Sequence, residues 1–129
     1  MVLKTAKLLI AIIGLCLGSA AFAEDLVYYG TGSTGTEYYY DAETIRKFKG
    51  DIVYVWMTAD ESKNKTVPYR RAMVMWRFNC SNETSGSLSF IAYRADGTVA
   101  DSSSTTSPEM TPIIPGSMNQ KLFKIVCSK

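Results

Sequence analysis

Side chains that could do chemistry are few in this sequence and lie far apart along it. The chain contains no histidine, so it offers neither a Ser–His or Cys–His pair to activate a nucleophile nor a histidine cluster to hold a metal ion. Its carboxylates occur singly along expected turns. The hydroxyl-rich segment from Asp101 to Pro108 has no base near it in the sequence, and we interpret it as a solvated loop. We therefore predict no enzyme activity, no cofactor and no metal site.

The first 23 residues have the pattern of a secretory signal peptide. Lys4 and Lys7 precede a weakly polar run that is shorter than the roughly 20 residues of a membrane-spanning helix. The run ends in Ala-Phe-Ala, which suits cleavage before Glu24. We predict an exported protein that is periplasmic or secreted, with association with the cell surface left open.

Two alternatives for this leader remain open. One is a membrane anchor that is retained rather than cleaved. The other is a lipoprotein, because a lipidated Cys16 would also end a signal peptide. We favour neither, since Leu15 stands where lipidation requires a small residue and the Ala-Phe-Ala site lies downstream.

Removing residues 1–23 leaves a mature chain of 106 residues, which is the size of one small domain. The leader takes two lysines with it, so residues 24–129 carry 12 basic and 12 acidic side chains. A domain with no net charge gives no electrostatic reason to expect a nucleic-acid partner. We also expect no integral membrane segment after cleavage.

The cysteines of the mature chain predict one disulfide. Cys16 is lost with the leader, which leaves Cys80 and Cys127 as a pair in an exported protein. Closing a loop of about 48 residues should stabilise the fold by roughly 4 kcal/mol. The alternative, two free thiols in a metal or redox site, lacks both a CxxC spacing and a histidine to complete it.

Most of the mature chain is rich in β-branched and aromatic residues. Glycine-containing turns separate these segments, and short connections imply antiparallel neighbours. The six predicted strands are Leu26 to Tyr29, Thr36 to Tyr40, Asp51 to Met57, Tyr69 to Cys80, Ser87 to Arg94 and Thr98 to Ser102.

The fourth predicted strand shows two different faces by its alternation. One face is apolar and predicts the core: Ala72, Val74, Trp76, Phe78 and Cys80. The other face carries Met73 and Met75 between arginines. Either another part of the chain covers these methionines, which we favour, or they form an exposed contact patch.

A C-terminal helix is predicted after Pro115. Ser117 and Gln120 have the spacing of a capping box. The apolar side chains that follow form one stripe, which should lie on the sheet: Met118, Leu122, Ile125 and Val126. The predicted disulfide would then join this helix to the sheet. A short helical turn is also expected from Asp41 to Ile45, with Asp41 as its N-cap. The predicted class is therefore an α+β fold.

The stretch TEYYYDAETIRKFKGDIVYVW, residues 36–56, holds the candidate binding residues. Alternation places Tyr38 and Tyr40 on one face of a strand and Tyr39 on the other, so the three tyrosines cannot form one patch. We interpret them mainly as sheet packing. The tentative binding residues are one tyrosine and the basic loop after it: Tyr39, Arg46, Lys47 and Lys49.

The order of several short motifs resembles the surface-adhesin protein E family of small exported bacterial proteins. These motifs are EYYYDAETI, KGDIVYVW, YRADGTVADS and IIPGSMNQKLFKIVC, and they span nearly all of the mature chain. Two departures stand out: Met110 occupies a place where the family tends to have tryptophan, and Tyr28 and Tyr29 replace a usual tryptophan in the first strand.

This resemblance implies an antiparallel sheet backed by a C-terminal helix, adhesion to host matrix and plasma proteins, and a homodimer. We expect an exported, non-enzymatic protein-binding module whose partner is a host matrix or plasma protein or a periplasmic protein. The alternative is a periplasmic structural or enzyme-inhibitor module with no adhesive role.

Overall fold

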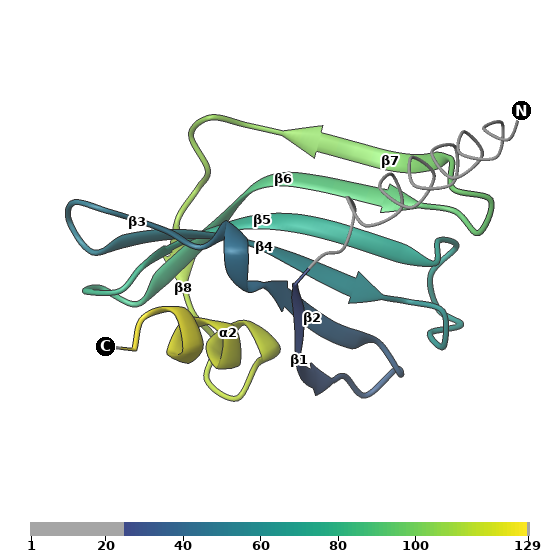
Figure 1. Ribbon diagram of the computed structural model, residues 1–129, viewed down its shortest axis with the longest axis horizontal. Coiled ribbons are helices and arrows are strands. Elements are labelled where there is room, and N and C mark those ends of the chain that lie inside the picture. Colours follow the sequence, from purple (N-terminus) through teal and green to yellow (C-terminus); the bar gives the residue numbers. More distant parts are fainter. Residues whose placement is uncertain (1–24, 129) are drawn as a thin grey trace, which may run out of the picture.

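The computed structural model describes residues 25–128 as one curved sheet with a helix against it (Figure 1). The predicted signal peptide, its cleavage site and Cys16 lie outside the described residues. The strands are β1 (Leu26–Thr31), β2 (Glu37–Asp41), β3 (Arg46–Phe48), β4 (Ile52–Asp60), β5 (Arg71–Asn79), β6 (Thr84–Tyr93), β7 (Val99–Ser104) and β8 (Thr111–Pro112). A 3-10 turn, η3 (Ala42–Thr44), follows β2, and the helix α2 (Met118–Val126) ends the fold. The predicted α+β class is confirmed.

The sheet has the strand order β1-β2-β4-β5-β6-β7, and all paired neighbours are antiparallel. These six strands are the predicted ones, with ends shifted by up to three residues. Two short strands were not predicted: β3 pairs with β4 beyond the end of β2, and β8 pairs with β6 beyond the end of β7.

The expectation that residues 46–49 form a loop is wrong for Arg46–Phe48, which form β3, whereas Lys49 does lie in a turn. Arg46, Lys47 and Phe48 pair with Tyr54, Val53 and Ile52 as the first arm of a hairpin. The turn between the arms contains Gly50 and Asp51 with φ of 78° and 60°, a conformation that glycine adopts freely and aspartate tolerates. The charged side chains of β3 gave no strand signal in the sequence, because strand propensity reflects packing against buried neighbours, which an edge strand lacks.

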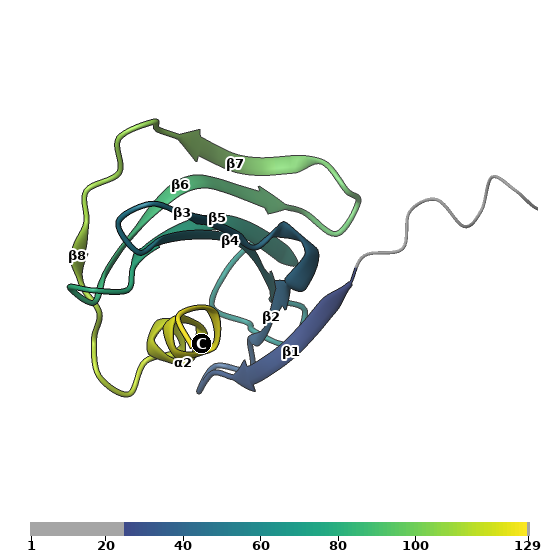
Figure 2. The same cartoon turned by 60° about the vertical axis from the view of Figure 1, so that its left-hand side comes forward.

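The core lies on the concave face of the sheet, which curves around α2 (Figure 2). We call this the inner face and the opposite side the outer face. Alternate residues of β4 and β5 supply the inner face, together with two residues of α2: Val53, Val55, Met57, Ala59, Ala72, Val74, Phe78, Leu122 and Val126. Trp76 and Cys80 pack against this cluster, so the predicted core face of β5 is confirmed.

The helix α2 begins at the predicted cap. The Ser117 hydroxyl accepts a hydrogen bond from the Gln120 backbone N–H at 3.1 Å, and the Gln120 side chain accepts one from the Gly116 N–H at 2.9 Å. Leu122 and Val126 are buried as expected, whereas Ile125 is 36% exposed, so its place in the stripe was wrong. Instead Phe123 packs on the core, with its ring centroid 6.1 Å from that of Phe78.

The disulfide between Cys80 and Cys127 is present, with a Cα–Cα distance of 5.6 Å. It joins the residue after β5 to the residue after α2, so the helix is held on the sheet as predicted. At the other predicted helical position, the Asp41 carboxylate caps η3 by accepting from the Glu43 N–H. Thr44 then accepts a hydrogen bond from the Trp56 N–H, which ties this turn to β4.

Candidate functional site

The outer face of the sheet carries large amphipathic side chains on its central strands. The strand β4 places Tyr54 and Trp56 there, and β5 places Met73, Met75 and Arg77 beside them. All five side chains are half-buried. No helix among residues 25–128 covers this face, because α2 lies in the concavity (Figure 2).

One short segment does reach the outer face, at its β6 end. A Cβ added at Gly86 would lie 2.7 Å from the Glu109 carbonyl oxygen and 3.1 Å from the Met110 sulfur. Gly86 pairs with Arg77, so this contact covers only the margin of the face. Met73 and Met75 lie further along β5, in pairs with Ile91 and Ser89. Both methionines are half-buried, so the favoured expectation that another part of the chain covers them stays a prediction.

The three consecutive tyrosines divide between the two faces as predicted. Tyr38 and Tyr40 lie on the inner side, each with its ring centroid 6.0 Å from that of Tyr29. Tyr39 pairs with Thr58 on the outer face, and its ring meets Tyr28 edge-on at 5.6 Å. Two adjacent strands thus present one aromatic pair on the outer face, of which Tyr28 is exposed and Tyr39 is half-buried.

The inner tyrosines are packing residues. Burial raises the pKa of Tyr29 above its ordinary value, and the neighbouring Tyr38 adds to this rise. Burial also raises the pKa of Tyr38, with the charge of Glu61 adding to the effect and a hydrogen bond with Thr36 opposing it. Both rings stay neutral at physiological pH, so neither supplies a charge or a base.

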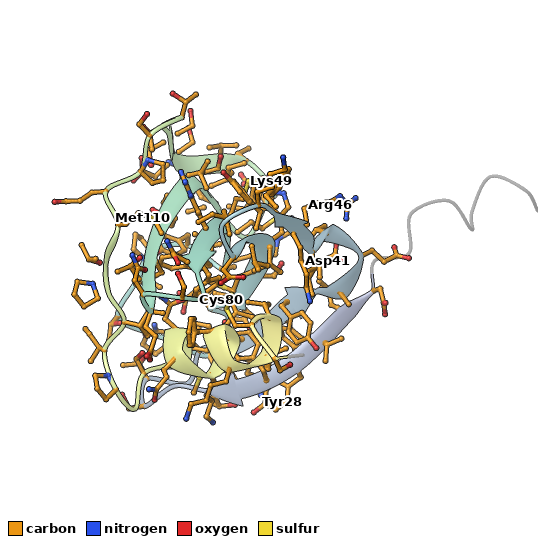
Figure 3. All side chains as sticks on the ribbon, turned by 90° about the vertical axis from the view of Figure 1, so that its left-hand side faces the viewer. Tyr28, Asp41, Arg46, Lys49, Cys80 and Met110 are labelled. Atoms are coloured by element: carbon orange, nitrogen blue, oxygen red, sulfur yellow. A yellow bond between two sulfur atoms is a disulfide. The ribbon has the colours of Figure 1, made fainter. Side chains whose placement is uncertain are left out.

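The three predicted basic residues share one hairpin but point in different directions. Arg46 pairs with Tyr54 on the outer face, Lys47 pairs with Val53 on the inner side, and Lys49 lies in the turn. All three are exposed. In the view of Figure 3, Arg46 and Lys49 lie in the upper part of the molecule, and Tyr28 lies at the bottom, beyond Cys80 and α2.

Tyr39 shares the outer face with Arg46 but does not touch it. Their partners on β4, Thr58 and Tyr54, are four residues apart, which corresponds to about 13 Å along a strand. Trp56 lies between them on the same face. The structure therefore brings the basic residues together and leaves Tyr39 as a separate position.

A shallow groove beside the β3–β4 hairpin was not predicted. It has a volume of about 510 Å³, and six residues line it: Thr44, Arg46, Phe48, Tyr54, Trp56 and Met75. We call it the hairpin groove. Phe48 and Tyr54 meet edge-on with ring centroids 5.2 Å apart. The sequence held a signal for this groove. Alternation on the two sides of the Lys49-Gly50-Asp51 turn places two residues of each arm on the outer face.

Lys47 faces a second cavity, on the inner side. This cavity of about 450 Å³ lies between the hairpin and the end of α2 and is bordered by the disulfide. Asp51 and Ser128 supply its other polar side chains. The two sides of this three-residue strand thus border different cavities: the hairpin groove, with three aromatic residues among its six lining residues, and the cavity beside the disulfide.

The described part of the chain shows no metal-binding cluster. Within residues 25–128 no three side chains of histidine, cysteine, aspartate or glutamate come together as ligands. The buried Glu61 instead accepts hydrogen bonds from Thr36 and Asn64. This polar cluster satisfies its own members and joins the β4–β5 connection to β2.

Membrane insertion by a helix is likewise not seen in this range. None of the helices found between residues 25 and 128 is long and apolar enough to cross a bilayer.

These features define a class of protein: one curved antiparallel sheet, a C-terminal helix held in its concavity by a disulfide, and an outer face that keeps aromatic side chains in solvent. The model of the surface-adhesin protein E family matches residues 27–128. The chain therefore belongs to the surface-adhesin protein E family.

Solved structures of Haemophilus influenzae protein E have a similar fold. Crystal form II gives a TM-score of 0.58 at 15% identity, with 82% of this chain and 89% of that chain covered. Protein E from non-typeable Haemophilus influenzae gives 0.51 at 14% identity, with 81% and 85% covered. Curated protein sequences give no match. At such identities the structural likeness concerns the fold.

Proposed function

We propose that this chain is an exported, non-enzymatic protein-binding module of the adhesin type. Its partner is a host matrix or plasma protein, or a protein of the periplasm. The observation that carries the proposal is the exposed basic hairpin next to an aromatic outer face. Aromatic and arginine side chains are the residues most enriched at protein interfaces. Membership of a family described as surface adhesins supports the same function.

Within this proposal the hairpin supplies the main contact. Arg46, Lys47 and Lys49 attract acidic groups of a partner, and the neighbouring rings bury apolar area once the partner is bound. Tyr39, with Tyr28 beside it, forms a second contact on the same face. A partner must span the roughly 13 Å between them to use both.

The test is capture of the purified mature protein by immobilised matrix and plasma proteins. A variant with Arg46→Ser, Lys47→Ser and Lys49→Ser should weaken capture, and the difference should shrink as salt is added, because exposed charges are screened. A matched control removes three exposed lysines elsewhere: Lys65→Ser, Lys121→Ser and Lys124→Ser. Equal losses in both variants would show a net-charge effect and contradict the assigned site.

Cell fractionation tests the adhesive role itself. Recovery of the mature protein only from the periplasm, together with no capture by any matrix or plasma protein, would leave the structural or inhibitory alternative. Our proposal also includes a homodimer, which the family resemblance implies. Sedimentation velocity over a range of protein concentrations would detect it.

A further inference from the structure

The hairpin groove has an apolar floor that the described chain leaves in solvent. Phe48 is 59% exposed although it lies on a strand and packs against Tyr54. Trp56 and Met75 continue the floor onto β4 and β5. Burying such rings releases water from apolar area, so a partner that covers the groove gains binding free energy from it.

Arg46 places positive charge at this groove, and Arg77 lies near it, against the ring of Tyr54. Within residues 25–128 neither arginine has a carboxylate partner. The Arg46 guanidinium donates to the backbone carbonyls of Glu43 and Ile45, at 2.7 and 3.0 Å. The Arg77 guanidinium lies 5.9 Å from the Tyr54 ring centroid, and its buried Nε has no hydrogen-bond acceptor. Among residues 25–128 the ion pair formed is Lys63 with Glu37, which involves neither arginine.

The backbone beside the groove is also unpaired on one side. Within the described range β3 pairs with β4 alone, so its other edge presents free N–H and C=O groups. Such an edge can accept an additional strand from another protein, with main-chain hydrogen bonds giving affinity and alternate side chains giving specificity.

The side chains of β3 define what that added strand must carry. Arg46 and Phe48 project to the outer face and Lys47 to the inner face. A strand beside β3 therefore places one side chain next to each of them in turn. The complementary pattern is an acidic residue at Arg46, an acidic residue at Lys47 and a large apolar residue at Phe48, where it packs against that exposed ring.

We propose that the free edge of β3 and the hairpin groove bind an extended acidic segment of a partner protein, with two adjacent acidic residues flanked by an aromatic one. This inference rests on the proposed protein-binding function and names its partner chemistry. The edge is only three residues long, so the side chains of the groove supply much of the affinity, and Arg46 and Lys47 select the charge.

The probe is a blocked peptide, Thr-Phe-Glu-Asp-Phe-Thr, which presents the pattern in either strand direction. Titration into ¹⁵N-labelled mature protein should shift the backbone amides of Arg46, Lys47 and Phe48 and the indole N–H of Trp56. A peptide with lysines in place of the two acidic residues should not bind. The acidic peptide methylated on its two central amide nitrogens should bind more weakly, because it loses main-chain hydrogen bonds.

Protein variants locate the contact. Phe48→Ser should weaken the peptide about tenfold, as expected for an interface anchor. Arg46→Gln should weaken it about threefold, as expected for an exposed ion pair. Lys65→Gln, which removes one charge elsewhere, should leave it unchanged. Phe48 and Arg46 are both exposed, so their replacement should not unfold the chain.

Three outcomes would overturn the inference. The acidic and lysine peptides could bind equally well, or the amide shifts could be confined to another surface. The third outcome is a homodimer that forms through β3 and that the acidic peptide does not dissociate. The last would make a second copy the occupant. Capture of matrix proteins that persists in Phe48→Ser would overturn this inference and leave the proposed function standing. Binding of the acidic peptide without capture by any matrix or plasma protein would leave this inference standing and overturn the proposed function.

Discussion

The inner and outer faces of this sheet are built by the same strands and differ in almost everything else. The inner face uses small and β-branched side chains such as Val53, Val55 and Ala72, which let α2 approach closely. The outer face uses Tyr54, Trp56 and Met75, which no helix among residues 25–128 covers and which are half-buried. Stability is therefore concentrated on one side of each strand, and candidate binding residues on the other.

The comparison also separates two kinds of aromatic residue. Tyr29 and Phe78 lie on the inner side, where other residues of the core cluster pack around them and no partner is needed. Phe48 and Tyr28 are 59% and 53% exposed on the outer side. Substitutions should therefore change stability on the inner face and binding on the outer face.

The largest effect is expected from Phe78→Ala. Phe78 is fully buried, so its truncation leaves a cavity and should lower the free energy of unfolding by about 3–5 kcal/mol. Phe48→Ala makes the same chemical change on the outer face and should lower it by about 0.5 kcal/mol or less. Urea unfolding followed by circular dichroism measures both, and similar losses would show that the outer face is part of the core.

Removing the disulfide should have the second-largest effect on stability. Replacing Cys80 and Cys127 together by serine frees the end of α2 from the sheet and should lower the free energy of unfolding by about 2–4 kcal/mol. The unreduced wild-type protein should also weigh two hydrogens less than the reduced one. Adding a reductant to the double variant is the control. Any further loss of stability there would mean that the reductant acts elsewhere.

A smaller loss is expected from Gly86→Ala, at the margin of the outer face that the chain does cover. Its new methyl group would meet the Glu109 carbonyl at 2.7 Å, and backbone has little room to move, so the cost should be about 1–3 kcal/mol. Gly30→Ala is the matched variant. There the nearest atoms belong to the flexible Met118 side chain, at 2.8 Å. A larger loss in Gly30→Ala would contradict this account of the covered margin.

The smallest effect concerns alkaline pH. Burial raises the pKa of Tyr29, so the native state keeps its proton when the unfolded chain ionises near pH 10. The resulting stability is fully present below about pH 10 and is lost as the pH rises toward the native pKa. Tyr29→Phe should reduce this decline between pH 9 and 11 in urea unfolding. If stability declines as steeply in Tyr29→Phe as in the wild type, groups other than Tyr29 cause the decline.

Much of the fold could be predicted from local patterns. Alternation in β5 identified the core face, and the Ser117 cap identified the start of α2, because both depend on a few neighbouring residues. The disulfide followed from an even count in an exported chain. The failures were β3, β8 and the exposed Ile125, where tertiary pairing or solvent contact overrides local preference.

The candidate site was predictable only in part. Arg46, Lys47 and Lys49 were identified by charge, and they do share one hairpin. Their distribution over two faces and a turn could not be read from charge alone, since it depends on pairing with β4. Tyr54 and Trp56 were read as strand residues and Phe48 as part of the loop before them. Nothing local shows that the face they share lacks a cover.

The sequence by itself determined which residues alternate, where the turns and caps lie, which cysteines pair and which family the motifs resemble. These properties are set by contacts between near neighbours or by composition. Only the tertiary structure decided which side of the sheet α2 occupies, and therefore which alternating set became core and which stayed in solvent. The helix and the strands it covers are far apart in the chain, so that choice depends on the packing of the whole domain.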